Sequence, residues 1–225
     1  MELVRILQLG DSMLPVGAFS FSNGLESAVQ HRVVHDLTTL RQYVGTATRQ
    51  AANADGIALL VAHRAALAGD DALVLAADRA VLIRKLNEEA RSMTLRMGRK
   101  LVELADRLLA TPRLGAWLAL IRQGETPGTH PVALALALAE QGVGERDAFE
   151  VHQYGVATMM IGAALRLMRM SYLDGQSILY EVNGAVAEHY AHVRTSTLDD
   201  MATFSPVADI LSACHLKARV RLFMG

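Results

Sequence analysis

The stretch VLIRKLNEEARSMTLRMGRKLVELADRLLA, residues 81–110, carries the clearest helical periodicity in the chain. Apolar side chains recur along it at steps of three or four residues, which places them on one face of an α-helix. This stripe consists of Leu82, Leu86, Ala90, Met93, Met97, Leu101, Leu104 and Leu108. Charged residues, including Glu88, Glu89 and Arg91, occupy the other faces. The pattern predicts an amphipathic helix with a solvated or partner-facing surface.

Three segments further along the chain are also predicted to be helical. Residues 146–170 are apolar nearly all round, with small residues and methionines that fill space, and we expect the central buried helix there. Residues 174–194 predict another long helix, and residues 206–217 the last one. Helix start signals occur at Asn23 with Glu26, Asp36, Thr111 before Pro112, His130 before Pro131, and Ser205 before Pro206.

No segment alternates between apolar and polar residues with the period of a strand, so the fold class is expected to be all-α. The stretches 122–130 and 195–205 are plausible loops, but neither marks a domain boundary. We therefore expect one domain over residues 1–225, a helical bundle of roughly ten helices.

Composition excludes several classes of protein. Apolar residues make up 52% of the chain, and its 22 basic and 23 acidic residues nearly cancel. Without a basic patch, nucleic acid is not an expected partner. The nonpolar runs are too short to span a bilayer, and the start of the sequence lacks the pattern of a signal peptide. With a single cysteine, Cys214, no intrachain disulfide is expected, and the cytoplasm is the expected location.

Catalytic and metal-binding patterns were weighed and set aside. Residues 9–14, LGDSML, imitate the nucleophile block of GDSL-type esterases, but Asp209 and His215 are too far apart for the Asp-x-x-His pair which that family needs. The sequence contains no phosphate-binding glycine loop and no His-Glu-x-x-His motif. The histidine pairs 31/35 and 189/192 are expected at the surface. No catalytic residue, resident metal or cofactor is predicted, and the chain is not expected to be an enzyme.

The N-terminal block LQLGDSMLPVGAFSFSNGLE, residues 7–26, resembles the signature of the UreF family of urease accessory proteins. Its physical logic is that Pro15 and Gly17 turn the chain, Phe19 anchors it, and Asn23 with Glu26 caps the next helix. Similar blocks follow in the family's order at 86–93 with 97–99, at 130–133 and at 174–176. The C-terminal tail keeps only part of the family's pattern, at His215 and residues 221–223.

This resemblance implies a helical, homodimeric adaptor that bridges the accessory subunit UreD, also called UreH, and the GTPase UreG. The assembly would act on apo-urease during GTP-dependent nickel insertion. Two alternatives stay open: a GTPase-activating protein that uses Arg91 or Arg99 as a finger, and a nickel-binding chaperone. The resemblance places partner contacts at Pro15, Gly17, Phe19, Ser20, Gly24, Glu26, Glu88, Arg91, Asp174, His215, Arg221, Leu222 and Phe223.

Overall fold

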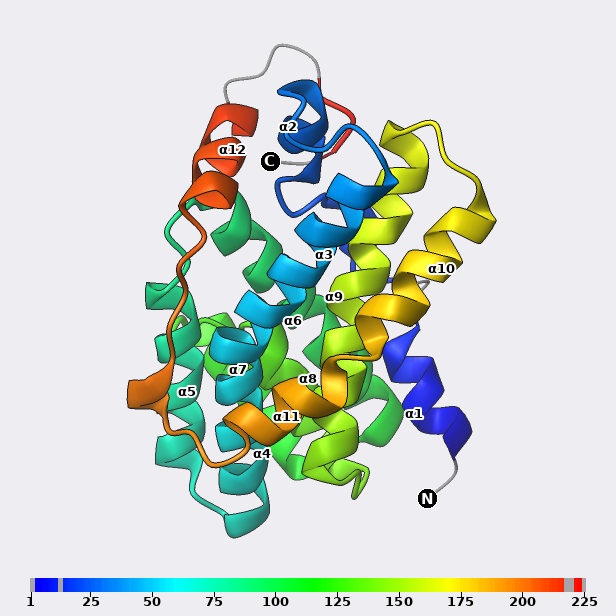
Figure 1. Cartoon of the computed structure of the whole chain (residues 1–225). Coiled ribbons are helices and arrows are strands. Elements are labelled where there is room, and N and C mark those ends of the chain that lie inside the picture. Colours follow the sequence, from blue (N-terminus) through cyan, green and yellow to red (C-terminus); the bar gives the residue numbers. More distant parts are fainter. Residues whose placement is uncertain (1–2, 12–13, 217–220, 224–225) are drawn as a thin grey trace.

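The computed structural model describes residues 3–11, 14–216 and 221–223, and within these ranges the chain is helical without a strand (Figure 1). The predicted all-α class is confirmed. The α-helices are α1 (Leu3–Gly10), α2 (Leu25–Gln30), α3 (Leu37–Ala51), α4 (Ile57–Ala68), α5 (Asp71–Ile83), α6 (Glu88–Leu109), α7 (Pro112–Gln123), α8 (His130–Glu140), α9 (Glu145–Leu167), α10 (Tyr172–Asn183), α11 (Val186–Val193) and α12 (Pro206–Leu216). Short 3-10 turns, η1 (Ala18–Ser20) and η3 (Leu198–Asp200), and a π-helical turn, η2 (Ala52–Gly56), complete the described elements.

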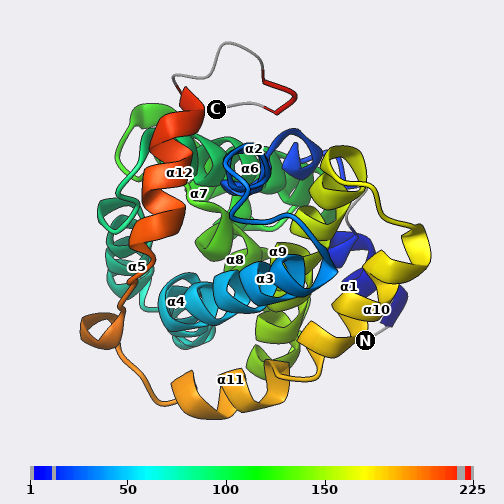
Figure 2. The same ribbon diagram turned by 45° about the horizontal axis from the view of Figure 1, so that its top comes forward.

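Helices α8 and α9 form the centre of the molecule (Figure 2). Every residue of α8 from Pro131 to Ala139 is buried, and this helix packs against α4 and α6. The first half of α9 joins the same core through Phe149. Its second half joins a separate group of buried side chains with α2, α3 and α10, through Met160 among others. The predicted central helix is therefore confirmed, and it connects the two parts of the core.

The long stripe predicted over residues 81–110 is interrupted. Helix α5 ends at Ile83, and α6 begins at Glu88 with Asn87 as its N-cap, so the two helices do not share one phase. Leu86 in the connection is 69% exposed, and Leu108 is 50% exposed. The buried face of α6 consists instead of Glu89, Thr94, Met97, Gly98, Leu101, Val102 and Ala105. Glu89 therefore faces the core, contrary to the prediction.

Other boundaries also differ from the prediction. The expected helix over 174–194 is two helices, because α10 ends at its C-cap Gly184 and α11 starts at Val186. At the start of α2, the left-handed Gly24 is the N-cap, and Asn23 precedes it with a positive φ of 53°. Helix α8 begins at His130 with Thr129 as its N-cap, one residue earlier than expected.

The remaining helix starts agree with the sequence. Asp36 forms a capping box with Thr39 at α3, and the Thr111 side chain accepts a hydrogen bond from the backbone of Leu114 at α7. Helix α12 begins at Pro206, directly after Ser205, as expected. Among the helices that the structure describes, none is both long and apolar enough to cross a membrane.

A buried carboxylate and a glycine set the approach of α6 to α8. Asp78 of α5 accepts hydrogen bonds from the backbone of Gly128 and Thr129, both at 2.7 Å, and so fixes the loop before α8. Gly98 of α6 lies against this loop: a Cβ added at Gly98 would come within 2.1 Å of the carbonyl oxygen of Gly128. Any side chain at position 98 would therefore push two backbones apart.

This contact predicts the effect of Gly98→Ala. Because the clashing atoms belong to the backbone, we expect a loss of about 3 kcal/mol in the free energy of unfolding, measured by urea denaturation. Gly155→Ala in α9 is the matched control, since a Cβ there meets nothing within 4 Å. The control should be neutral or stabilised by up to about 1 kcal/mol. Equal effects of the two variants would contradict the packing described for Gly98.

A buried histidine predicts loss of stability in acid. His152 of α9 is 3% exposed, and burial lowers its pKa from 6.5 to about 4. Between these two values the unfolded chain binds more protons at this residue, so the free energy of unfolding should fall as the pH drops from about 6.5 to about 4. His152→Gln should flatten this slope in denaturation curves, whereas the same change at exposed His31 should leave it intact. An unaltered slope in His152→Gln would exclude this cause.

Candidate functional site

The two ends of the chain meet at the carboxylate of Glu26. This residue lies in the first turn of α2 and is 3% exposed. Its Oε1 accepts a hydrogen bond from the backbone of Leu222 at 2.7 Å, and its Oε2 accepts one from the backbone of Phe223 at 3.1 Å. Helix α12 also packs against α2 (Figure 1).

His215 joins the same carboxylate to a second one. Its Nε2 lies 2.7 Å from Oε2 of Glu26, and its Nδ1 lies 3.0 Å from Oε2 of Glu89. The imidazole is fully buried, and Glu89 is 2% exposed. Burial raises the pKa of Glu89, although the neighbouring His215 opposes this shift. Helices α2, α6 and α12 are thus linked through one solvent-excluded polar cluster.

Next to this polar cluster, the side chain of Arg166 lies against two aromatic rings. The guanidinium carbon of Arg166, in the last turn of α9, lies 3.8 Å from the ring centroid of Phe19 and 4.1 Å from that of Phe223. Its Nη2 donates a hydrogen bond to the carbonyl oxygen of Phe19 at 2.9 Å. Such stacking adds cation–π attraction to the backbone contact. Arg166 therefore ties η1 in the N-terminal block to the C-terminal tail.

We call this arrangement the tail junction: Phe19, Glu26, Glu89, Arg166, His215 and residues 221–223. Phe223 is buried within it, but Leu222 is 59% exposed and Phe19 is 69% exposed. Phe19 is held at the surface by Arg166, whereas the neighbouring Phe21, 2% exposed, is buried in the core. The junction therefore includes exposed apolar side chains from both end segments of the chain, Phe19 and Leu222.

Two glycines shape the N-terminal block. Gly17 has φ = 92° before η1, and Gly24 has φ = 77° before α2, a region that other residues rarely adopt. Gly24 is buried, and a Cβ there would lie 2.9 Å from both the hydroxyl of Ser212 and that of Tyr43. Gly24 thus allows α12 to approach α2. Ser20 ends η1, and its backbone N–H donates to the carbonyl oxygen of Gly17.

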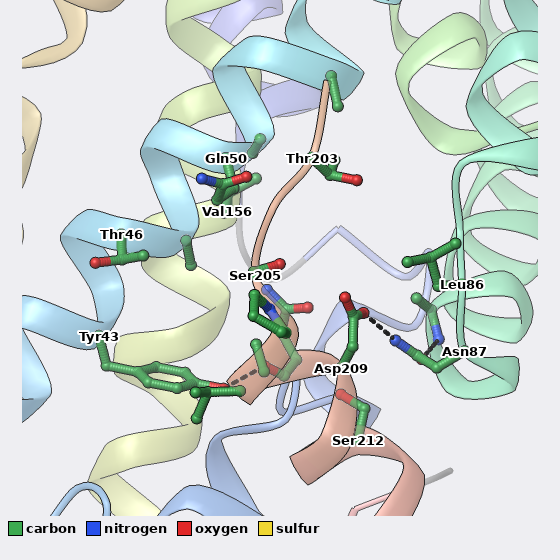
Figure 3. A pocket seen from close by; sticks show the side chains of 18 of the residues that line it. Tyr43, Thr46, Gln50, Leu86, Asn87, Val156, Thr203, Ser205, Asp209 and Ser212 are labelled. Carbon is green, nitrogen blue, oxygen red and sulfur yellow. Dashed lines mark hydrogen bonds between the residues drawn. The ribbon is translucent and has the colours of Figure 1, made fainter. Parts of the chain in front are cut away.

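A cavity of about 460 Å³ lies beside the junction, between α3, α9, the α5–α6 connection and α12 (Figure 3). On one side, Tyr43 donates a hydrogen bond from its hydroxyl to the carbonyl oxygen of Asn23. On another, Asn87 donates from its side-chain amide to Asp209 of α12 at 3.0 Å. Lys85 and Asp55 also line it and form an ion pair at 2.7 Å. The wall is mixed in character, with several amides and hydroxyls.

The described residues do not assemble the esterase-like arrangement considered from the sequence. Leu9 and Gly10 belong to helix α1, where that arrangement needs a strand, and Ser12 lies outside the described residues. Asp209 is bonded to Asn87, and His215 is engaged by two glutamates. A search of the described residues for three His, Cys, Asp or Glu side chains able to hold one metal ion finds no such group.

Three of the predicted contact residues lie in neither the N-terminal block nor the tail. Glu88 is exposed at the start of α6, and exposed Arg91 donates from its Nε to the carbonyl oxygen of Lys85. Asp174 caps α10, since its carboxylate accepts hydrogen bonds from the backbone and hydroxyl of Ser171, which lower its pKa. The structure thus brings the N-terminal block and the tail together, and leaves these three residues apart from them.

Sequence reasoning missed two members of the junction. The charge pattern puts Glu89 in a solvated run. Glu89 nevertheless shares one row of the helix with Met93, Met97 and Leu101, because these residues follow one another at steps of four. Arg166 was not singled out, although it is the one charged residue in the apolar stretch 156–168. A charge within an apolar row or stretch was the available signal for both residues.

Comparison with known proteins identifies the family of the chain. The sequence model of the UreF family matches residues 34–183. The urease accessory protein UreF 2 of Brucella canis is 55% identical over 99% of this chain and 92% of its own length. The urease accessory protein UreF of Yersinia pestis is 47% identical over 99% of this chain and 97% of its own. The chain belongs to the UreF family of urease accessory proteins.

Proposed function

We propose that this chain is a cytoplasmic adaptor that bridges UreD/UreH and the GTPase UreG while nickel is inserted into apo-urease. The observation that supports this role best is the tail junction, where both ends of the chain form one fixed surface with exposed apolar side chains at Phe19 and Leu222. Apolar side chains held rigidly at a surface lose little entropy on binding, which suits a protein contact. We assign this surface to UreD/UreH.

The contact with UreG is proposed on a different surface. Glu88 and Arg91 are exposed at the start of α6, and Asp174 lies at the start of α10. Charged residues at the rim of an interface set register and exclude wrong partners. Because Asp174 already caps α10, Glu88 and Arg91 are the stronger candidates of the three.

The adaptor role is favoured over the two alternatives. A GTPase-activating finger needs an arginine that reaches a phosphate, whereas Arg99 pairs with Glu103 and Arg91 donates to the backbone of Lys85. A nickel chaperone needs clustered ligands, and the described residues offer no group of three His, Cys, Asp or Glu side chains arranged to hold one metal ion. Nickel is therefore treated as cargo of the assembly and not as a ligand of this chain.

A homodimer is also part of the proposal. Apolar side chains are exposed on α1, at Val4 and Leu7, and on α10, at Tyr172, Leu173 and Tyr180. The methionines Met97 and Met160 are not available for this contact, since both are buried in the core. We therefore assign the dimer contact to exposed apolar residues such as these.

A single exposed side chain tests the UreD/UreH surface. Leu222→Asp keeps the backbone N–H that binds Glu26 and places a charge at the centre of the proposed contact, so capture of the cognate UreD/UreH should fall at least about tenfold. Leu67→Asp is the matched control, because Leu67 is 65% exposed at the end of α4, away from the junction. Capture is measured by co-expression and pull-down, with nickel-dependent urease activity as a second readout. Equal capture by both variants would refute this assignment.

Charge reversal tests the UreG surface separately. Glu88→Arg combined with Arg91→Glu should weaken capture of UreG several-fold and lower urease activation, while capture of UreD/UreH stays unchanged. The matched control is reversal of the exposed pair Arg146 and Glu150 on α9. If UreG is captured and urease is activated as before, Glu88 and Arg91 are not part of the contact.

A further inference from the structure

The cluster of Glu26, His215 and Glu89 needs a second proton on or beside the imidazole. Both ring nitrogens of His215 lie within hydrogen-bond distance of a carboxylate oxygen, at 2.7 and 3.0 Å. A carboxylate only accepts hydrogen bonds, and a neutral imidazole has one N–H to donate. Without the second proton, one ring lone pair would face a carboxylate lone pair in a site closed to water.

The contacts of the two carboxylates show where this proton lies. Glu26 accepts from the ring and from two backbone N–H groups, which is the environment of an ionised carboxylate. Within the part of the chain that the structure describes, Glu89 is bonded through Oε2 alone, and its buried Oε1 has no hydrogen-bond partner. The second proton is therefore shared between Nδ1 of His215 and Oε2 of Glu89.

We propose that Glu26, His215 and Glu89 form a pH-sensitive latch, which holds residues 221–223 on α2 while the shared proton is bound and releases them when it is lost. We call these three residues the latch. Loss of the proton leaves two buried carboxylates on either side of a neutral ring, and release of the tail relieves this cost because it admits water to them. The inference deepens the proposed function, because the latch controls whether Leu222 is presented beside Phe19.

Burial and two of the neighbouring charges act on the pKa of Glu89 in opposite directions, and burial has the larger effect. The ionisable groups that act on Glu89 are Glu26 of α2, Tyr43 of α3, and His215 and Arg221 of the C-terminal segment. Burial outweighs the lowering by His215 and Arg221, so the pKa of Glu89 is raised. A raised pKa in the folded state contributes stability at lower pH that is lost as the pH rises through it. The latch therefore opens on the alkaline side.

Release should be confined to the C-terminal end of the segment. The hydrogen bond between Asn87 and Asp209 holds the first half of α12 independently of the latch. Arg166 keeps its contact with the Phe19 carbonyl oxygen, which involves no atom of the tail. The N-terminal block and the start of α12 should thus stay in place when residues 221–223 are released.

The test is amide hydrogen exchange of the full chain followed by NMR, with the ring nitrogens of His215 observed in the same samples. After correction for intrinsic rates, protection of the Leu222 and Phe223 amides should fall about tenfold or more as the pH rises, with the same midpoint as the change in the His215 ring signals. In Glu89→Gln, the amide donates to a neutral Nδ1, so protection should stay within about twofold. Glu103→Gln, on the same helix, should behave as the wild type.

The hydrogen-exchange experiment can overturn the latch in two ways. Protection that stays constant while the His215 signal titrates, or an identical pH profile in wild type and Glu89→Gln, would overturn the latch. If Glu89→Gln does not fold, the coincidence of the two wild-type midpoints remains the criterion. Because no partner protein is present, this result is independent of the capture experiments: a working latch with no binding of UreD/UreH would contradict the proposed function alone.

Discussion

The carboxylate of Glu26 is the contact on which the arrangement of both chain ends depends. It lies in the first turn of α2, and it holds His215 together with the backbone of residues 222 and 223. A buried carboxylate is costly unless it is well bonded, and here the partners come from nearly 200 residues away in the sequence. The same bonds that satisfy the charge therefore decide where the tail lies.

Helices α9 and α6 position the side chains that surround this carboxylate. Helix α9 spans both parts of the core, and its last turn carries Arg166 to the junction. Helix α6 is fixed against the loop before α8 at Gly98, and its first turn delivers Glu89. The junction is thus supported by two of the longest helices, whereas its outer side is left to Phe19 and Leu222. A base of packed helices with an exposed apolar edge is suited to contact with another protein.

The sequence predicted the helical class, the central helix over 146–170 and most helix starts, because these depend on local periodicity and capping. It did not show the break at residues 84–87, since apolar spacing continues through a connection where Leu86 is exposed. That break shifts the phase of α6 and turns Glu89 inward. The resemblance found the N-terminal block and the tail, but their meeting at Glu26 joins residues too far apart for local patterns to reveal.

The direct measurement of this central contact is a double-mutant cycle between Glu26 and His215. The free energy of unfolding is determined at neutral pH for the wild type, Glu26→Gln, His215→Gln and the double variant. Residues that share a buried bond are not independent, so the account predicts a coupling of about 2 kcal/mol. Effects that add to within about 0.3 kcal/mol would show that the two side chains do not interact in the folded protein, and would contradict the account.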